Sequence, residues 1–226
     1  MVAHAADTGL PATLATALEG AELDTADGWA FRQTQAIQAL NEPAMIAVTR
    51  WDPSKPAGEQ CTVVSVTKEG KPAKDEDPCE GEHDRELYGE LVPLLEDALI
   101  ETVSEDDQLA VYRIEPKDRD HGFSMGGLHV DIGDDDSKNL LGTVNVMKAG
   151  PGAPYVERVA FTLKEPSGNM LAKLKRLDIV YTYAPDLLTG AKLLQGLDVN
   201  LNLTVITFFN VTTDVSMRFD EYRKLK

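Results

Sequence analysis

The C-terminal third of the chain alternates apolar and polar residues almost without interruption. Between residues 197 and 219 the intervening polar positions are mainly Asp, Asn, Thr and Ser. Successive side chains of a strand point to opposite faces of a sheet, so this pattern predicts two long strands with one buried face. A turn near Asn210 would join them into an antiparallel hairpin. The apolar positions are Leu197, Val199, Leu201, Leu203, Val205, Val211, Val215, Met217 and Phe219.

Shorter runs of β-branched and aromatic residues, separated by Gly, Pro, Asn and Asp, predict further strands. Their short connections favour antiparallel pairing between neighbours. Gly142 and Gly196 fall inside these runs and are typical of bends or close approaches in a curved sheet, with a local bulge as the alternative at each position. The predicted strands are residues 29–38, 44–51, 61–66, 109–115, 126–132, 140–148, 155–164, 171–183, 193–209 and 211–223, with a charged linker at 67–84.

Two segments carry the spacing of a helix. Leu10, Leu14 and Leu18 predict a short helix within residues 8–26. Leucines at helical spacing predict a longer amphipathic helix over 85–103, which either kinks at Pro93 or restarts near Val92. The sequence therefore predicts an α+β fold that is mainly β. A strongly curved antiparallel sheet of about nine or ten strands would wrap around one or two helices. We expect a single domain over residues 8–226, preceded by a tail at 1–7.

The charge of the chain excludes some classes of partner. The formal net charge is −16, and the sequence has no stripe of Lys and Arg residues. Such a surface repels nucleic acid and a bare anionic membrane. No run of about 18 apolar residues occurs, so no membrane-spanning helix is predicted. The acidic residues are otherwise typical of a solvated surface.

The two cysteines and the N-terminus indicate the compartment. Residues 3–7 resemble the small-residue end of a secretory signal without its apolar stretch. Cys61 and Cys79 are the two cysteines, and they form no zinc or redox spacing. In an exported protein they would pair as a disulfide, which would contribute about 3 kcal/mol to stability. Two separate buried thiols are the alternative.

The sequence offers little for catalysis or for metal binding. The four histidines are His4, His83, His121 and His129, and none accompanies a nucleophile motif. The acidic run from Asp131 to Asn139 resembles a calcium loop, but Asn139 stands where the loop requires Gly. We interpret this run as a solvated turn, with calcium binding as the alternative. We predict no enzyme activity, cofactor or metal.

The apolar face is the candidate site. If the sheet curls, the apolar positions line its concave side, which a helix can fill or an acyl chain can occupy. Both possibilities stay open at the level of the sequence. The predicted ligand-binding residues are Ile179, Tyr181, Leu197, Val199, Leu201, Leu203, Val205, Val215, Met217 and Phe219.

Three short segments carry a family resemblance. Residues 50–59 (RWDPSKPAGE), 154–159 (PYVERV) and 215–223 (VSMRFDEYR) resemble segments of exported proteins of Gram-negative bacteria. The order of elements is similar to that of the periplasmic lipoprotein-localisation carriers of the LolA/LolB type. The resemblance implies a half-barrel closed by helices, with an apolar cup for acyl chains and a periplasmic location. It also implies one arginine that latches the helices to the cup, for which Arg32, Arg50 and Arg113 are candidates.

The function predicted from these features is non-catalytic. The chain would bind a hydrophobic small molecule, a lipid or a lipoprotein in the concave face of the half-barrel. The alternative is a cell-envelope interaction module with a self-filled core, whose exposed edge strand docks another protein. The sequence identifies neither the ligand nor the partner, nor the oligomeric state.

Overall fold

Within its described residues, the computed structural model contains the short helix α1 (Ala12–Leu18) and fourteen strands. Those residues are 9–19, 28–40, 42–73, 76–79, 91, 95, 98–116, 123–125, 128–130, 139–168, 172–205 and 209–225. The strands are β1 (Trp29–Ala39), β2 (Met45–Trp51), β3 (Cys61–Lys68), β4 (Lys71–Pro72), β5 (Ala98–Glu105), β6 (Leu109–Pro116), β7 (Phe123–Met125), β8 (Leu128–Val130), β9 (Leu140–Met147), β10 (Tyr155–Leu163), β11 (Ser167–Gly168), β12 (Ala172–Pro185), β13 (Lys192–Val205) and β14 (Phe209–Lys224).

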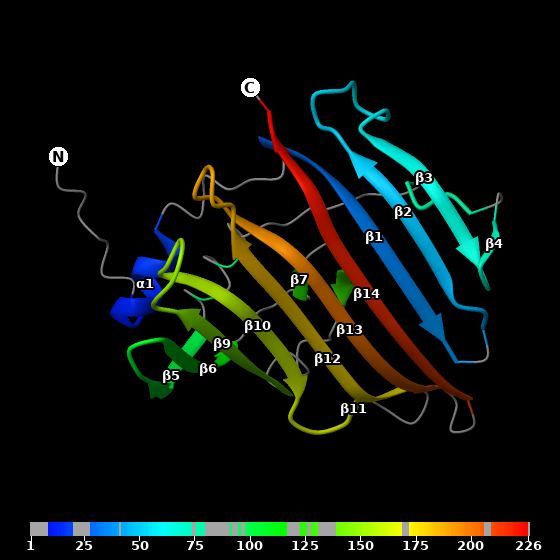
Figure 1. Ribbon diagram of the computed structural model, residues 1–226. Coiled ribbons are helices and arrows are strands. Elements are labelled where there is room, and N and C mark those ends of the chain that lie inside the picture. The colour runs from blue at the N-terminus through cyan, green and yellow to red at the C-terminus, as the bar shows by residue number, and fades with distance from the viewer. Residues whose placement is uncertain are drawn as a thin grey trace.

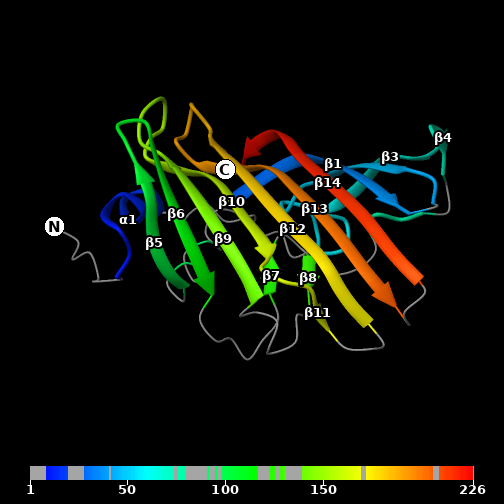
Figure 2. The ribbon, with the colours of Figure 1, turned by 90° about the horizontal axis from the view of Figure 1, so that it is seen from below.

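Twelve of these strands form one antiparallel sheet, shown in Figure 1. The order is β4-β3-β2-β1-β14-β13-β12-β10-β9-β6-β5, with β11 paired to β12. The first strand β1 pairs with the last strand β14, so these two strands meet in the interior of the sheet. Because β4 and β5 end the order and do not pair with each other, the sheet stays open. Figure 2 shows it as a curved layer with α1 at one end.

The register defines two faces of the sheet. We call the inner face the one that carries Ile179, Tyr181 and Leu197, and the outer face the one that carries Val180 and Asp198. Residues directly paired in an antiparallel ladder lie on the same face. One inner row therefore crosses eight strands: Ile114, Gly142, Phe161, Ile179, Val199, Val215, Ile37 and Met45.

The missing side chain of Gly142 is part of the packing of this row. A Cβ at this position would lie 2.3 Å from Cγ1 of Ile114 and 2.9 Å from Cε1 of Phe161. The two larger side chains fill the space that the glycine leaves. The sequence-based interpretation of Gly142 as a point of close approach is therefore confirmed.

The predicted fold class is confirmed: the protein is mainly β, with an open, curved antiparallel sheet. The predicted strands match the observed ones closely in β1, β2, β9 and β10, and the N-terminal helix is found as α1. The strand predicted at 126–132 is instead part of a small hairpin, because β8 pairs with β7.

Three expectations need correction. The helix predicted over 85–103 cannot reach its predicted end, because β5 is a strand paired with β6. Leu91 and Leu95 are helical and fully buried, while most of the segment lies outside the described residues. The linker predicted at 67–84 contains the end of β3 and all of β4. Asn210 does not form a turn, because it pairs with Thr204 inside the β13–β14 ladder.

Candidate functional site

The ten residues predicted to bind a ligand lie on the inner face by register. Five of them are buried, with exposed fractions of 8% or less, and the inner face thus forms much of the core. Leu201, Val215 and Met217 are partly buried against that core. Leu203 is half-buried, and the side chain of Val205 lies outside the described residues. The five buried residues are Ile179, Tyr181, Leu197, Val199 and Phe219.

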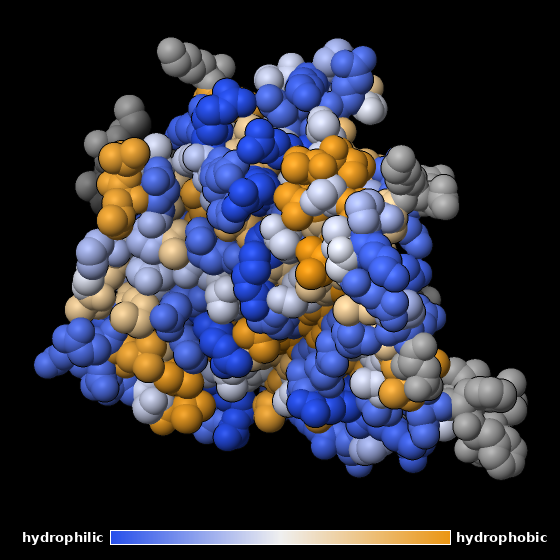
Figure 3. Space-filling view, turned by 45° about the vertical axis from the view of Figure 1, so that its right-hand side comes forward, coloured by the Kyte–Doolittle hydropathy of each residue, from blue (hydrophilic) through white to orange (hydrophobic). Residues whose placement is uncertain are grey.

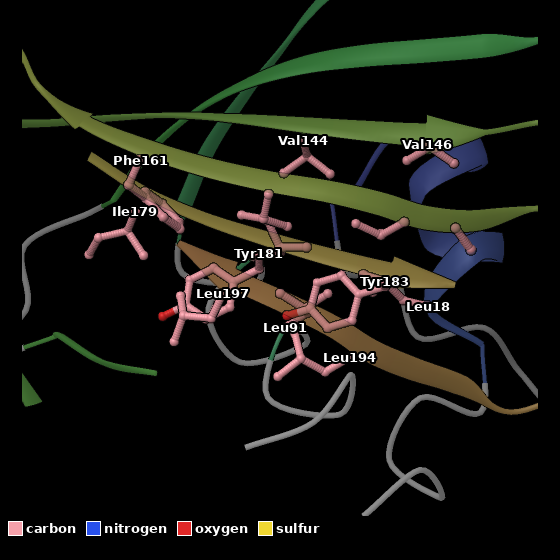
Figure 4. Close-up of a cluster of buried hydrophobic side chains, with 14 of the residues drawn as sticks. Leu18, Leu91, Val144, Val146, Phe161, Ile179, Tyr181, Tyr183, Leu194 and Leu197 are labelled. Carbon is pink, nitrogen blue, oxygen red and sulfur yellow. The ribbon is translucent and has the colours of Figure 1, made fainter. Parts of the chain in front are cut away.

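One part of the inner face is completely filled. We call it the closed part, and it spans β6, β9, β10, β12 and the first half of β13. Leu14 and Leu18 of α1 belong to the same buried cluster, as do Leu91 and Leu95. Figure 4 shows Leu18 and Leu91 among the buried side chains, with Leu18 beside Tyr183. The largest side chains of the closed part with exposed fractions below 2% include Tyr112, Phe161, Ile179 and Tyr181. This packing resembles an ordinary protein core.

A second part of the inner face is apolar but incompletely covered. We call it the open part, and it consists of Ile37, Met45, Leu201, Val215 and Met217. Val215 lies opposite Ile37, which in turn lies opposite Met45. All five side chains keep intermediate exposure. The open part therefore continues the apolar rows of the closed part across β14, β1 and β2.

Two of these residues were not among the predicted ligand-binding positions. Ile37 and Met45 lie in strands that were predicted correctly, but their place beside Val215 depends on the pairing of β1 with β14. That pairing joins segments about 180 residues apart, and periodicity alone gives no long-range partner. The only local indication that β1 contributes to the inner face was the apolar Ile37, which lies between Ala36 and Gln38.

Amide side chains border the open part. By register, Gln33 lies opposite Phe219 and Gln35 opposite Met217, so both are inner-face residues. The Gln33 amide is 3.7 Å from the sulfur of Met217. Binding sites for amphiphiles combine an apolar lining with a few polar groups of this kind. The open part thus offers contacts for an apolar chain and for a polar group next to it.

An aromatic cluster lies beside the open part. The rings of Phe31 and Phe219 meet edge to face at 5.8 Å, and Trp29 meets Tyr222 at 6.1 Å. The Tyr222 hydroxyl donates to the carbonyl oxygen of Leu194 at 2.5 Å. Burial raises the pKa of Tyr222 well above its ordinary value. These contacts give Phe219 a structural role in the core.

The three candidate latch arginines do not reach the inner face. Arg32 and Arg50 lie opposite each other on the outer face. Arg113 alternates with the buried Tyr112 and Ile114, and it pairs with Glu101 at 3.2 Å. The expectation that one of these arginines latches the cup is therefore wrong. Tyr181, one of the predicted ligand-binding residues, is only 1% exposed.

Cys61 and Cys79 form a disulfide, as predicted for an exported protein. Of the remaining candidates, His4, His83 and His121 lie outside the described residues, as do residues 131–138 of the acidic run. His129 is in β8, and its side chain is not described.

Asn139 is the described end of the acidic run. Its amide oxygen accepts from the Glu165 backbone N–H at 3.1 Å, so the side chain holds a turn. Within the part of the chain that the structure describes, no three His, Cys, Asp or Glu residues could hold a metal ion. No described helix is long and apolar enough to cross a membrane.

The outer face also has a hollow, with a volume of about 500 Å³. Its apolar lining includes Ala36, Ile46 and Val180, and Asp198 and Asp214 contribute carboxylates. Ile37, Met45 and Val215 of the open part also line it. Figure 3 shows a diagonal strip of apolar residues between hydrophilic ones on one side of the molecule. Exposed apolar side chains are therefore not confined to the inner face; Ile46, for example, is 46% exposed.

Comparison with known proteins gives one distant similarity. No protein-family model matches the sequence, and no curated protein matches it. The crystal structure of a LolA superfamily protein from Nitrosomonas europaea is similar at a TM-score of 0.34 and 11% sequence identity. That similarity covers 96% of this chain and 95% of the other. Because the TM-score is below 0.5, we base the function on the residues of this chain.

Proposed function

We propose that this chain is a non-catalytic periplasmic protein that binds the acyl chain of a lipid or lipoprotein on the open part of the inner face. One observation carries the proposal. The apolar row that is completely buried at Phe161 and Ile179 continues through Val215, Ile37 and Met45, where burial is only partial. An apolar surface continuous with a core is suited to a flexible hydrocarbon chain.

The closed part then acts as scaffold. Its packing fixes β12 and β13, which in turn position the strands of the open part. Each methylene transferred from water contributes about 0.8 kcal/mol. An acyl chain with about ten buried methylenes would gain about 8 kcal/mol before the costs of association. The Gln33 and Gln35 amides would contact the polar group at the end of such a chain.

The disulfide supports the periplasmic location. Disulfides persist in oxidising compartments, which include the bacterial periplasm. Cys61 begins β3, next to the strand that carries Met45, and its partner Cys79 lies beyond β4. The bond links the chain after β4 to the start of β3, which lies opposite Trp51 at the far end of β2 from Met45.

Titration with a fluorescent fatty acid tests this function. Val215→Asp places a charge among apolar side chains of the open part, and we expect at least a tenfold loss of affinity. Ser216→Asp is the matched control, because the neighbouring residue of β14 introduces the same charge on the outer face. Circular dichroism checks that both variants are folded. A wild-type chain that does not bind the probe, or equal losses in both variants, would contradict the proposal.

An interaction module is the second candidate, and β5 favours it. This strand ends the sheet, and Leu99 and Val103 are 61% and 54% exposed. An exposed edge strand can accept an extended segment of another protein. Native mass spectrometry of the purified chain separates the two functions. Lipid-sized additional mass supports the carrier, whereas a ligand-free chain that binds neither fatty acid nor phospholipid supports the module.

A further inference from the structure

A second hollow of the outer face, with a volume of about 420 Å³, lies where β1, β2 and β14 meet the loop after β2. Four cationic side chains line it in a protein whose net charge is −16. We call it the cationic pocket. Its lining includes Arg32, Arg50, Lys55, Thr62 and Arg223.

The register brings two of these cations into direct opposition. Arg32 on β1 is paired with Arg50 on β2, and like charges placed opposite each other destabilise a sheet. The Glu221 carboxylate bridges them, at 2.7 Å from Arg32 and 3.0 Å from Arg50. Glu221 has a positive φ of 53° and lies where the pairing of β14 with β1 shifts register. The irregularity in β14 thus keeps the arginines together.

Arg32 makes more contacts than the other three cations of the pocket. It binds both carboxylate oxygens of Asp220, at 2.8 and 2.7 Å, in addition to Glu221. A two-pronged contact of this kind fixes the plane of the guanidinium group. Arg32 therefore serves as the structural base of the cationic pocket.

The other three cations are less engaged. Among the described residues, Arg50 donates one side-chain hydrogen bond, which goes to Glu221. Arg223 donates one to Asp52 at 3.2 Å. The Lys55 ammonium donates to the Thr62 hydroxyl at 3.3 Å. A guanidinium group has five N–H donors and an ammonium group has three, so each cation retains donors for a ligand.

The charge of the pocket favours an anion. Four cations face three carboxylates, those of Asp52, Asp220 and Glu221, which leaves an excess of one positive charge. The side chains of Arg50 and Arg223 are 61% and 65% exposed, so a ligand from solvent can reach them. Donors that come from three separate side chains suit an anion with several oxygens better than a planar carboxylate.

We propose that the cationic pocket binds a phosphate group through Arg50, Lys55 and Arg223. The phosphate is either free or part of a lipid headgroup, since both present the same oxygens. The site lies on the outer face, at the other end of β1 and β2 from Ile37 and Met45 of the open part, and it does not depend on acyl-chain binding. Because its side chains are exposed, binding weakens as ionic strength rises.

Titration of the full chain with inorganic phosphate, followed by NMR of the arginine side chains, tests the proposal. We expect saturable shifts at Arg50 and Arg223, and at least tenfold weaker binding in the double variant Lys55→Gln with Arg223→Gln. The matched control is Arg113→Gln with Lys164→Gln. It removes the same charge from two other outer-face ion pairs, with Glu101 and Glu115. Melting temperatures verify folding, and the single variant Arg50→Gln provides a second test.

A second titration distinguishes the source of the phosphate. Vesicles of phosphatidylcholine are compared with vesicles that also contain phosphatidic acid. Binding that requires phosphatidic acid and is lost in the pocket variants assigns the site to a headgroup, whereas binding of inorganic phosphate alone assigns it to free phosphate. If neither probe binds, or if the control variant loses as much affinity as the pocket variants, the proposal is wrong.

Discussion

The closed and open parts of the inner face have similar side chains but different surroundings. Both present aliphatic residues at every second position of long antiparallel strands. In the closed part, Ile179 and Leu197 are completely buried, whereas Val215 and Met217 in the open part keep intermediate exposure. The difference comes from what covers each part. Helix α1, Leu91 and Leu95 pack on the closed part, and the same sheet extends beyond them.

This comparison shows that alternation identifies an apolar face without stating how that face is used. The closed part contributes to stability, because its side chains are removed from water in the free protein. The open part retains apolar area that a ligand can still bury. A substitution in the closed part should therefore change mainly the free energy of unfolding, and one in the open part mainly the affinity for ligand.

The largest contrast is expected between two leucines of β13. Leu197→Ala leaves a cavity in the closed part and should lower the free energy of unfolding by about 4 kcal/mol. Leu201→Ala removes a partly exposed side chain, and the expected loss is about 1 kcal/mol. Urea unfolding measures both values. Equal losses would show that the two parts of the face are not distinct.

The disulfide should have the next largest effect. Replacing both Cys61 and Cys79 by Ser removes a link across 18 residues, and we expect a loss of about 3 kcal/mol. The closed part contains neither cysteine, so its packing should persist and near-UV circular dichroism should be retained. An unchanged melting temperature would count against the disulfide as a stabilising link.

Tyr222→Phe tests the aromatic cluster that lies beside the open part. Losing the hydrogen bond to Leu194 should cost about 1–2 kcal/mol, because a buried carbonyl loses its donor. The raised pKa of Tyr222 also predicts a pH effect. In the unfolded chain tyrosine ionises at about pH 10, whereas in the folded protein burial keeps the Tyr222 hydroxyl neutral. The wild type should therefore lose stability as pH rises above about 10, and the variant should lose less. Unfolding curves between neutral and alkaline pH measure this difference.

The smallest effect is expected from neighbouring residues of β2. Ile46→Thr changes the outer face and should alter the free energy of unfolding by less than about 0.5 kcal/mol. Met45→Thr changes the open part and should weaken fatty-acid binding while leaving most of the stability. If Ile46→Thr weakens binding as much as Met45→Thr, the ligand does not bind on the inner face.

The sequence predicted most of the sheet, because regular alternation in β13 and β14 separates an apolar face from a polar one. Prediction from the sequence was less successful in β5, where the same residues fit both the helical and the strand periodicity. Ala98, Leu99 and Thr102 fit a helix, but Ile100, Thr102 and Val103 are β-branched and favour a strand. The turn before β6 could have indicated that a strand precedes it. The Asp106 carboxylate accepts from the backbone N–H groups of Gln108 and Leu109, which is typical of a hairpin connection.

The candidate site was predicted in part. The residues of β12, β13 and β14 were placed correctly on one face, but which of them are filled and which are accessible depends on the elements that cover them. Ile37 and Met45 were missed because they join the face through the β1–β14 pairing. The cationic pocket was also missed, since Arg32, Arg50 and Arg223 are distant in sequence and meet only through the register.

Methyl NMR of the full chain during a titration with lauric acid tests the central claim most directly. We expect saturable shifts at the methyl groups of Ile37, Met45 and Val215, with little change at Ile179 and Val144. Shifts confined to the outer-face residues Ile46 and Val180, or no saturable shift at any of these groups, would contradict the claim that the open part is the binding surface.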